Sequence, residues 1–184
     1  PDLAVDVHVA IRETSKALEL AQVITPYKLM CIEVPARAEF IESSAELRRK
    51  FRVALATGEN LYGVHRFTEL LNADAVDIIQ PDLLCCGGFL EAKKIAAIAE
   101  AHYVTVAPHN PLGLISTAAA VHHSASINNF AILEWHGDDK KKKSELVNES
   151  WVPKDGYFEL PTDAGIGMTL NHNAIKENPP LHWD

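Results

Sequence analysis

The sequence predicts an α/β fold in which helices cover a parallel sheet. Short apolar runs that suit strands alternate six times with helix-like stretches, in units of about 25 residues. Parallel strands need long crossover connections, and helices supply them, so this alternation favours parallel pairing over hairpins. Hydrophobic residues make up 47% of the 184 residues and charged residues 23%, as in an ordinary globular domain with a sizeable core.

Each expected strand is an apolar run closed by a polar residue or a turn signal. In chain order the strands cover residues 3–8, 29–35, 53–56, 75–80, 104–111 and 130–134. The expected helices cover residues 15–23, 43–51, 63–71, a long segment opened by Gly87-Gly88, and 114–126. Ser43 or Ser44 is the expected cap of the second helix. The buried stripe of the long helix is expected to consist of Ala92, Ile95, Ala96, Ile98 and Ala99.

The alternation defines residues 1–136 as the β/α units of the domain. Residues 137–184 carry loops, an aromatic stretch and a Gly-rich stretch, so we expect this segment to pack over the outside or one end of the domain. The chain opens directly in a core-type strand, which suggests that further sequence precedes it.

Charge and cysteine content exclude several classes of protein. The net charge of −8 leaves no basic patch to neutralise phosphates, and the short basic run Lys140–Lys143 has the character of a solvated loop, so nucleic acid is not an expected partner. No apolar run reaches the roughly eighteen residues of a membrane span, so no membrane association is expected. Three cysteines, Cys31, Cys85 and Cys86, give no disulfide framework, which favours a reducing, cytoplasmic location.

Ionisable side chains stand at the carboxyl end of every expected strand. In chain order they are Asp6 with His8, Glu33, Glu59, Asp82, His109 and Glu134. One such residue is common at a strand end, but six strands in succession are harder to explain in that way. In a β/α barrel these ends converge on one pocket, where ligands and catalytic groups collect.

Asp6, Glu33 and Glu59 are carboxylates on consecutive strands, each one β/α unit after the last. Three facing carboxylates cannot all stay ionised without a cation. A hard divalent ion such as Mg²⁺ suits carboxylate, water and substrate oxygens, and the absence of His or Cys among the three disfavours zinc. The sequence therefore predicts a magnesium site.

Asp82 and His109 follow on the next two strands. A histidine at a strand end can be a general base, a metal ligand or a satisfied polar residue. A carboxylate from the neighbouring strand can orient the ring and raise its basicity. No serine with a nucleophile-elbow signature accompanies the pair, which disfavours acyl transfer and favours proton abstraction.

Six motifs carry these residues across nearly the whole chain. They are Asp6-Val7-His8, Ile32-Glu33-Val34-Pro35, Gly58-Glu59, Gln80-Pro81-Asp82 followed by Gly87-Gly88, Ala107-Pro108-His109-Asn110-Pro111-Leu112-Gly113, and Leu133-Glu134. Their combination resembles the barrel domain of the enolase superfamily, in its mandelate racemase-like branch, and within it the acid-sugar dehydratases of the galactonate dehydratase type. Val34 departs from the second acidic residue usual in that family, a position that is not a ligand.

The resemblance implies a TIM-type (β/α) barrel that is incomplete here, with about six β/α units and without the N-terminal capping domain and first strands. It also implies a lyase activity: Mg²⁺-dependent dehydration of a galactonate-like sugar acid to a 2-keto-3-deoxy acid, by loss of the α-proton and the β-hydroxyl. The matched residues are the Mg²⁺ ligands Asp6, Glu33 and Glu59, the basic dyad His109 and Asp82, the general acid His8, and Glu134, which hydrogen-bonds the enolate oxygen.

Two alternatives stay open. A racemase or epimerase of the same superfamily would also use His109, although the match of His8 to the acid argues against it. A truncated fragment could instead keep the site residues and do no chemistry.

The expected partner is a small-molecule sugar acid, and the unpaired edges of an incomplete barrel favour a homo-oligomer. His136, just after Glu134, could also touch the substrate. The histidines expected to be structural or solvated are His65, His102, His122, His123, His172 and His182.

Overall fold

The computed structural model describes residues 2–111, 113–136, 144–149 and 152–177. The basic run Lys140–Lys143 and His182 lie outside these residues. Among the described residues, no helix is long and apolar enough to cross a bilayer.

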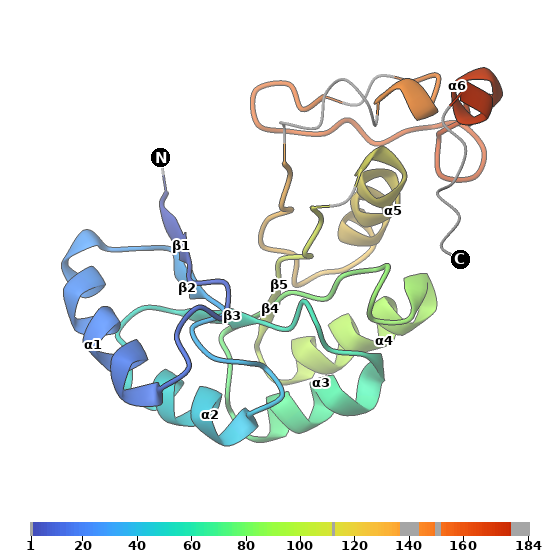
Figure 1. Ribbon diagram of the computed structural model, residues 1–184. Helices are drawn as coiled ribbons and strands as arrows, with labels where there is room; N and C mark the ends of the chain where they lie inside the picture. The colour runs from blue at the N-terminus through green and yellow to red at the C-terminus, as the bar shows by residue number, and fades with distance from the viewer. Residues whose placement is uncertain (1, 112, 137–143, 150–151, 178–184) are drawn as a thin grey trace, which may run out of the picture.

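Five parallel strands form one sheet whose spatial order is the order of the chain. They are β1 (Ala4–Asp6), β2 (Cys31–Glu33), β3 (Leu55–Thr57), β4 (Ile78–Ile79) and β5 (Thr105–Val106). In Figure 1 the strands make a curved row, and helices lie along its outer, convex side. The predicted α/β fold with parallel pairing is therefore confirmed.

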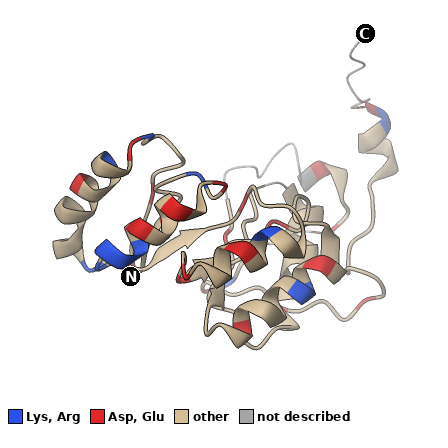
Figure 2. Ribbon diagram, turned by 90° about the horizontal axis from the view of Figure 1, so that it is seen from below, with Lys and Arg blue, Asp and Glu red and all other residues tan. Residues whose placement is uncertain are grey.

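In the described part of the chain, five helices fall where the apolar periodicity predicts them, and a sixth, short helix lies in the C-terminal segment, where none was predicted. They are α1 (Thr14–Ile24), α2 (Ile41–Lys50), α3 (Gly63–Asn72), α4 (Gly88–Ala101), α5 (Gly113–Ala125) and α6 (His172–Glu177), with short 3₁₀ turns η1 (Thr25–Tyr27) and η3 (Ser144–Leu146). Acidic and basic side chains are interspersed on the outer helices (Figure 2). In α4 the expected stripe is buried except at Ile98, which is partly exposed.

The predicted serine cap of α2 is wrong. The helix begins at Ile41, and the backbone N–H groups of Ser43 and Ser44 donate to the carbonyl of Phe40 at 3.1 and 3.2 Å. The serines thus lie inside the first turn, and Ser43 Oγ accepts from Thr14 Oγ1 of α1 at 3.4 Å. The Ser43 hydroxyl therefore contacts the neighbouring helix α1 instead of capping α2.

The predicted sixth strand, residues 130–134, forms a single parallel bridge between Val106 and Phe130 rather than a strand. Side-chain amides take the place of a longer ladder. Asn129 Nδ2 donates to the carbonyl of Val104 at 2.9 Å, and Asn110 Nδ2 donates to the carbonyl of Glu134 at 3.0 Å. Backbone pairing with β5 is short: Val106 N–H donates to the carbonyl of Asn129, and Ala131 N–H donates to the carbonyl of Val106, both at 2.8 Å. The segment therefore pairs with the sheet at its start and then follows it without a longer ladder.

Alternation of side chains along each strand separates two faces of the sheet. The outer face carries Leu55, Ile79 and Val106, which belong to the main core together with side chains of the covering helices. Cys31, Ala56, Ile78 and Ala107 form a smaller cluster on the inner face. Because Glu33 pairs with Ala56, it follows the inner face at the carboxyl end of the sheet. The fold thus directs this carboxylate to the edge where the site was predicted.

The division of the chain at residue 136 stays a prediction. The C-terminal segment does contact the β/α units, since the rings of Trp135 and Phe158 meet edge to face with centroids 5.9 Å apart. Phe158 also lines a cavity of about 700 Å³ with Val121 of α5 and with Leu133.

His123 of α5 is buried, with 2% of its surface exposed, and its Nε2 atom has no hydrogen-bond partner. Burial lowers the pKa of His123 to about 4, and the charge of Lys93 adds to this effect. The ring is therefore neutral in the folded protein at neutral pH, which agrees with the structural role expected for it.

This burial predicts a loss of stability in mild acid. The unfolded chain binds a proton at His123 below pH 6.5, whereas the folded chain does so only near pH 4. The stabilisation is therefore complete above pH 6.5 and falls as the pH drops to 4, by up to about 3 kcal/mol. We expect His123→Gln to flatten this part of the pH profile of the free energy of unfolding, measured with urea.

His102→Gln is the matched control, because His102 lies exposed after α4. It should keep the wild-type slope. Equal slopes for wild type and His123→Gln would contradict the prediction.

Candidate active site

His109 and Asp82 meet at the carboxyl ends of β5 and β4, as the sequence predicts. His109 Nδ1 lies 2.8 Å from Asp82 Oδ2. Asp82 is 1% exposed, and its second oxygen accepts the backbone N–H of Leu84 at 2.7 Å. With Nδ1 occupied, the other ring nitrogen, Nε2, faces Glu59 Oε2 at 3.5 Å. The pair therefore presents one nitrogen of a fixed ring to the carboxylates of the site.

The surroundings raise the pKa of His109. Burial alone would lower it, but the hydrogen bond with Asp82 and the charges of Glu134, Glu59 and Asp82 together outweigh burial. An imidazole whose protonated form is stabilised in this way is a stronger base than a free one. The role of general base stays a prediction, but the geometry and charge suit it.

Glu59 is 6% exposed and follows Gly58, whose φ of +129° few side chains adopt. A Cβ at Gly58 would lie 2.9 Å from Phe67 Cε1, so the loop can pass close to α3 only with glycine there. Asn60 Nδ2 donates to Glu59 Oε1 at 2.9 Å. The carboxylate is thus held in place from within its own loop.

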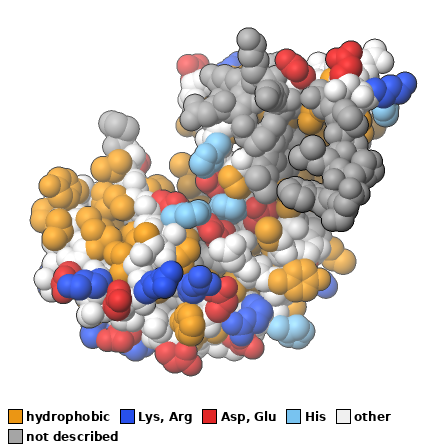
Figure 3. Space-filling view, in the orientation of Figure 1, with side chains coloured by type: hydrophobic (Ala, Val, Ile, Leu, Met, Phe, Trp, Pro, Cys, Tyr) orange, Lys and Arg blue, Asp and Glu red, His pale blue; other side chains and the backbone are white. Residues whose placement is uncertain are grey.

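Glu33 is surrounded by other acids. Its pKa is raised by burial first, and then by the charges of Asp6, Glu134 and Glu59, while a hydrogen bond from Gln80 opposes the rise. Four carboxylates, three of them at or just after the ends of β1, β2 and β3 and the fourth at Glu134, therefore lie within electrostatic range of one another. In Figure 3, histidine side chains lie beside acidic ones near the centre of the face shown.

The three predicted metal ligands are neighbours, but they do not form a closed site. Asp6 and Glu33 are register partners on β1 and β2. Asp6, however, turns to His8, accepting its backbone N–H at Oδ1 over 2.6 Å. Within the part of the chain that the structure describes, no three His, Cys, Asp or Glu side chains converge closely enough to hold an ion.

The donor set nevertheless fits a hard divalent cation. All three predicted ligands offer carboxylate oxygens. Burial is the main cause of the raised pKa of Glu33, and the neighbouring negative charges add a repulsion that a cation would relieve. The assignment of Asp6, Glu33 and Glu59 as ligands stays a prediction.

His8 stands apart from the basic pair. It follows β1, at the opposite end of the sheet from β5. Its side chain is 76% exposed, its Nδ1 lies 3.5 Å from Asp6 Oδ2, and its φ of +48° marks a tight turn. An acid here and a base at His109 would approach a ligand from different sides.

Glu134 has two partners that the sequence did not identify. The backbone N–H of Asn110 donates to Oε2 at 2.8 Å, and His136 Nε2 lies 2.6 Å from Oε1. Asn110 is 2% exposed. An asparagine between the candidate base His109 and Pro111 is the sequence signal that could have identified it.

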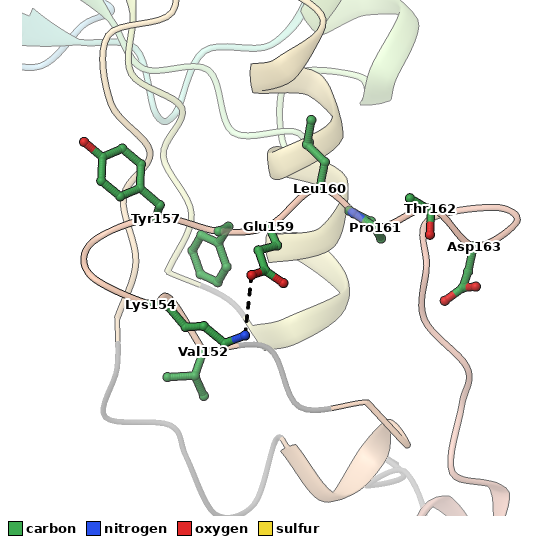
Figure 4. Close-up of a pocket in the computed structure, with 9 residues that line it drawn as sticks. Val152, Lys154, Tyr157, Glu159, Leu160, Pro161, Thr162 and Asp163 are labelled. Carbon is green, nitrogen blue, oxygen red and sulfur yellow. Dashed lines mark hydrogen bonds and ion pairs between the residues drawn. The ribbon is translucent and has the colours of Figure 1, made fainter.

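Among the described residues, further cavities have none of the predicted site residues in their lining. They include the cavity near α5 and a second one formed by residues 152–163. The second has about 310 Å³ and is drawn in Figure 4. There Lys154 Nζ and Glu159 Oε1 approach to 3.5 Å, and Tyr157 points away from them. A cavity of about 320 Å³ does reach the site, since Glu59 lines it with Arg37. The predicted site residues therefore mark a place distinct from the C-terminal cavities.

Comparison with known proteins identifies a matching family. The family described as enolase C-terminal domain-like matches residues 1–174. A D-xylonate dehydratase from Haloferax volcanii is 34% identical over 175 residues, which cover 95% of this chain and 42% of that protein.

Solved structures of similar chains share the fold. An enolase from Agrobacterium radiobacter, provisionally named a galactarate dehydratase and bound to sodium and L-malate, is 38% identical with a TM-score of 0.91 over 100% of this chain and 50% of its own. The 3,6-anhydro-D-galactonate cycloisomerase from Zobellia galactanivorans is 27% identical with a TM-score of 0.89, over 96% of this chain and 50% of its own. The chain thus spans about half the length of these relatives.

The contact between Asp82 and His109 predicts a change in titration. Asp82→Asn removes the negative charge and leaves at most a weaker, neutral hydrogen bond to His109, so the pKa of His109 should fall. The measurement is NMR titration of the His109 ring in buffer without divalent ions.

Asp155→Asn, an exposed change in the C-terminal segment, is the control and should leave the titration of His109 unchanged. A wild-type titration curve in Asp82→Asn would show that the pair does not form in solution.

Proposed function

The chain belongs to the enolase C-terminal domain-like family, and on that premise we propose that it is the barrel part of a lyase that removes water from a sugar acid. The observation that carries the proposal is the fixed His109 ring, whose Nε2 faces the carboxylates. The comparison also supports the interpretation of the curved sheet as part of a TIM-type barrel, since an enolase structure superposes on the whole chain. The resemblance predicted from the six motifs is thereby confirmed.

The substrate class follows from the relatives. One acts on D-xylonate by name, and another is provisionally named for galactarate, both of them sugar acids. We propose the finer assignment of a galactonate-like acid and a 2-keto-3-deoxy acid product. The partner is then a small molecule, and we further propose a homo-oligomer in the cytoplasm, where the free thiols of Cys31, Cys85 and Cys86 would stay reduced.

His109 would act first, by taking the α-proton at Nε2. Asp82 holds Nδ1 and stabilises the imidazolium that results. The charges of Glu59 and Glu134 favour the same protonated form. The chain thus supplies a base that is oriented and electrostatically supported.

Asp6, Glu33 and Glu59 would hold Mg²⁺. When bound there, the ion would draw charge from the substrate carboxylate and make the adjacent C–H bond more acidic. With its carboxyl group protonated, Glu134 would donate a hydrogen bond to a carboxylate oxygen of the substrate. His8 would donate a proton to the departing β-hydroxyl, and the enol left behind would rearrange to the keto acid.

A racemase or epimerase remains the second candidate, because one observation favours it. His8 is 76% exposed and turned to Asp6, which is not the posture of a poised acid. The cycloisomerase from Zobellia galactanivorans also shows that a 27% identical chain of the same fold bears a name other than dehydratase.

The cation site can be tested on the chain itself. We expect weak Mg²⁺ binding by calorimetry, and a loss of about tenfold or more in affinity for Glu59→Gln, because the neutral amide removes one charged ligand.

Glu39→Gln is the matched control. Glu39 lines the same cavity as Glu59, yet it is exposed and is not a proposed ligand. Unchanged affinity in Glu59→Gln would remove that residue from the site.

The two histidines should fail differently in the complete natural protein. His109→Asn removes the base, so both exchange of the α-proton with D₂O and dehydration should cease. His8→Asn removes only the acid, so exchange should survive while dehydration falls about 10²–10⁴-fold. The measurement is deuterium incorporation followed with keto-acid formation, over galactonate, gluconate and mannonate.

Dehydration at the wild-type rate in His8→Asn would favour the racemase. Equal loss of exchange in both variants would instead assign His8 to substrate binding.

A further inference from the structure

Both carboxylate oxygens of Glu134 are engaged by neighbours. Oε2 accepts the backbone N–H of Asn110 at 2.8 Å, and Oε1 lies 2.6 Å from His136 Nε2. Glu134 is partly exposed, with 32% of its side chain accessible. A long carboxylate side chain in that setting has rotational freedom unless partners restrict it. These two contacts therefore decide where its oxygens point.

Asn110 is the rigid partner. Its Nδ2 donates to Thr117 Oγ1 at 3.1 Å, and that hydroxyl donates in turn to the carbonyl of Gly113 at 3.0 Å. The same Nδ2 donates to the main-chain carbonyl of Glu134 at 3.0 Å. A buried amide thus ties the backbone of Glu134 to the first turn of α5.

His136 is the exposed partner, with 59% of its side chain accessible. Burial does not fix this ring, so its short contact with Glu134 is not a by-product of core packing. The charge of Glu134 acts on His109 and on Glu33, so the carboxylate lies within electrostatic range of both the candidate base and a predicted ligand.

We propose that His136 is a positioning residue: its Nε2–H donates to Glu134 Oε1 and, with the N–H of Asn110 on Oε2, holds this carboxyl group toward the site. The consequence for turnover rests on the proposed function, in which the protonated carboxyl group of Glu134 donates a hydrogen bond to a substrate oxygen as negative charge develops there. An interaction made mainly in the transition state governs kcat more than KM.

Two substitutions of His136 separate this role from a general surface role. The amide nitrogen of glutamine reaches the place of Nε2, whereas that of asparagine reaches only the place of Nδ1. In the complete natural protein, His136→Asn should lower kcat about 10- to 100-fold with KM nearly unchanged, and His136→Gln should restore most of it. In a Glu134→Gln background, His136→Asn should add no further loss, because it acts through Glu134.

A second readout needs no turnover. The amide proton of Asn110 reports its bond to Glu134 Oε2 by NMR, so its chemical shift should move in His136→Asn and in Glu134→Gln but stay near wild type in His136→Gln. An unmoved Asn110 signal in His136→Asn overturns the inference, as does an equal loss of kcat in the Asn and Gln variants. If the unmodified protein neither exchanges nor dehydrates any of the sugar acids, the proposed function fails, while the Asn110 signal still decides the role of His136.

Discussion

The buried carboxylate of Asp82 is the constraint on which the rest of the site depends. At 1% exposure it cannot remain charged without partners, and its surroundings supply them. One oxygen accepts from Leu84 and the other meets His109, while its carbonyl accepts the N–H groups of Cys85 and Cys86 at 3.0 and 2.7 Å. A single residue thus fixes the turn that leads into α4 and the orientation of the ring that follows β5.

The two faces of the sheet divide the remaining tasks. Large side chains such as Leu55 and Ile79 pack outward against the helices and hold the strands in register. The inner face carries small residues such as Ala56 and, at the carboxyl end, Glu33. Because direction alternates along a strand, outward packing determines which polar residues face inward. The apolar core and the acidic edge therefore both result from the alternation of side-chain direction along the strands.

The sequence could predict which residues stand at the strand ends, since apolar runs closed by polar residues fix their order. It could not predict side-chain directions. Asp6 and Glu33 are neighbours as expected, yet Asp6 turns to His8 because a backbone N–H lies within reach. Residues 130–134 were predicted to form a strand, but the Asn129 amide binds the carbonyl of Val104 beside β5, and the Asn110 amide binds the carbonyl of Glu134. The first outcome depends on a local turn and the second on contacts between residues distant in sequence, and the alternation of apolar and polar residues encodes neither.

Burial is the largest influence on the pKa values of Glu33 and His109, since it raises the first and opposes the rise of the second, but the two groups also share one electrostatic contribution. The charges of Glu59 and Glu134 disfavour ionisation of the acid and favour protonation of the base. Positive charge from any origin, whether a proton on the ring or a bound cation, would relieve the same repulsion. The charge of Glu134 acts on both Glu33 and His109. Its orientation therefore influences both the protonation of His109 and the binding of a cation near Glu33. His136 is exposed, yet it contacts Glu134 and so helps to set where that negative charge lies. It therefore influences the electrostatics of the base and of the predicted ligand.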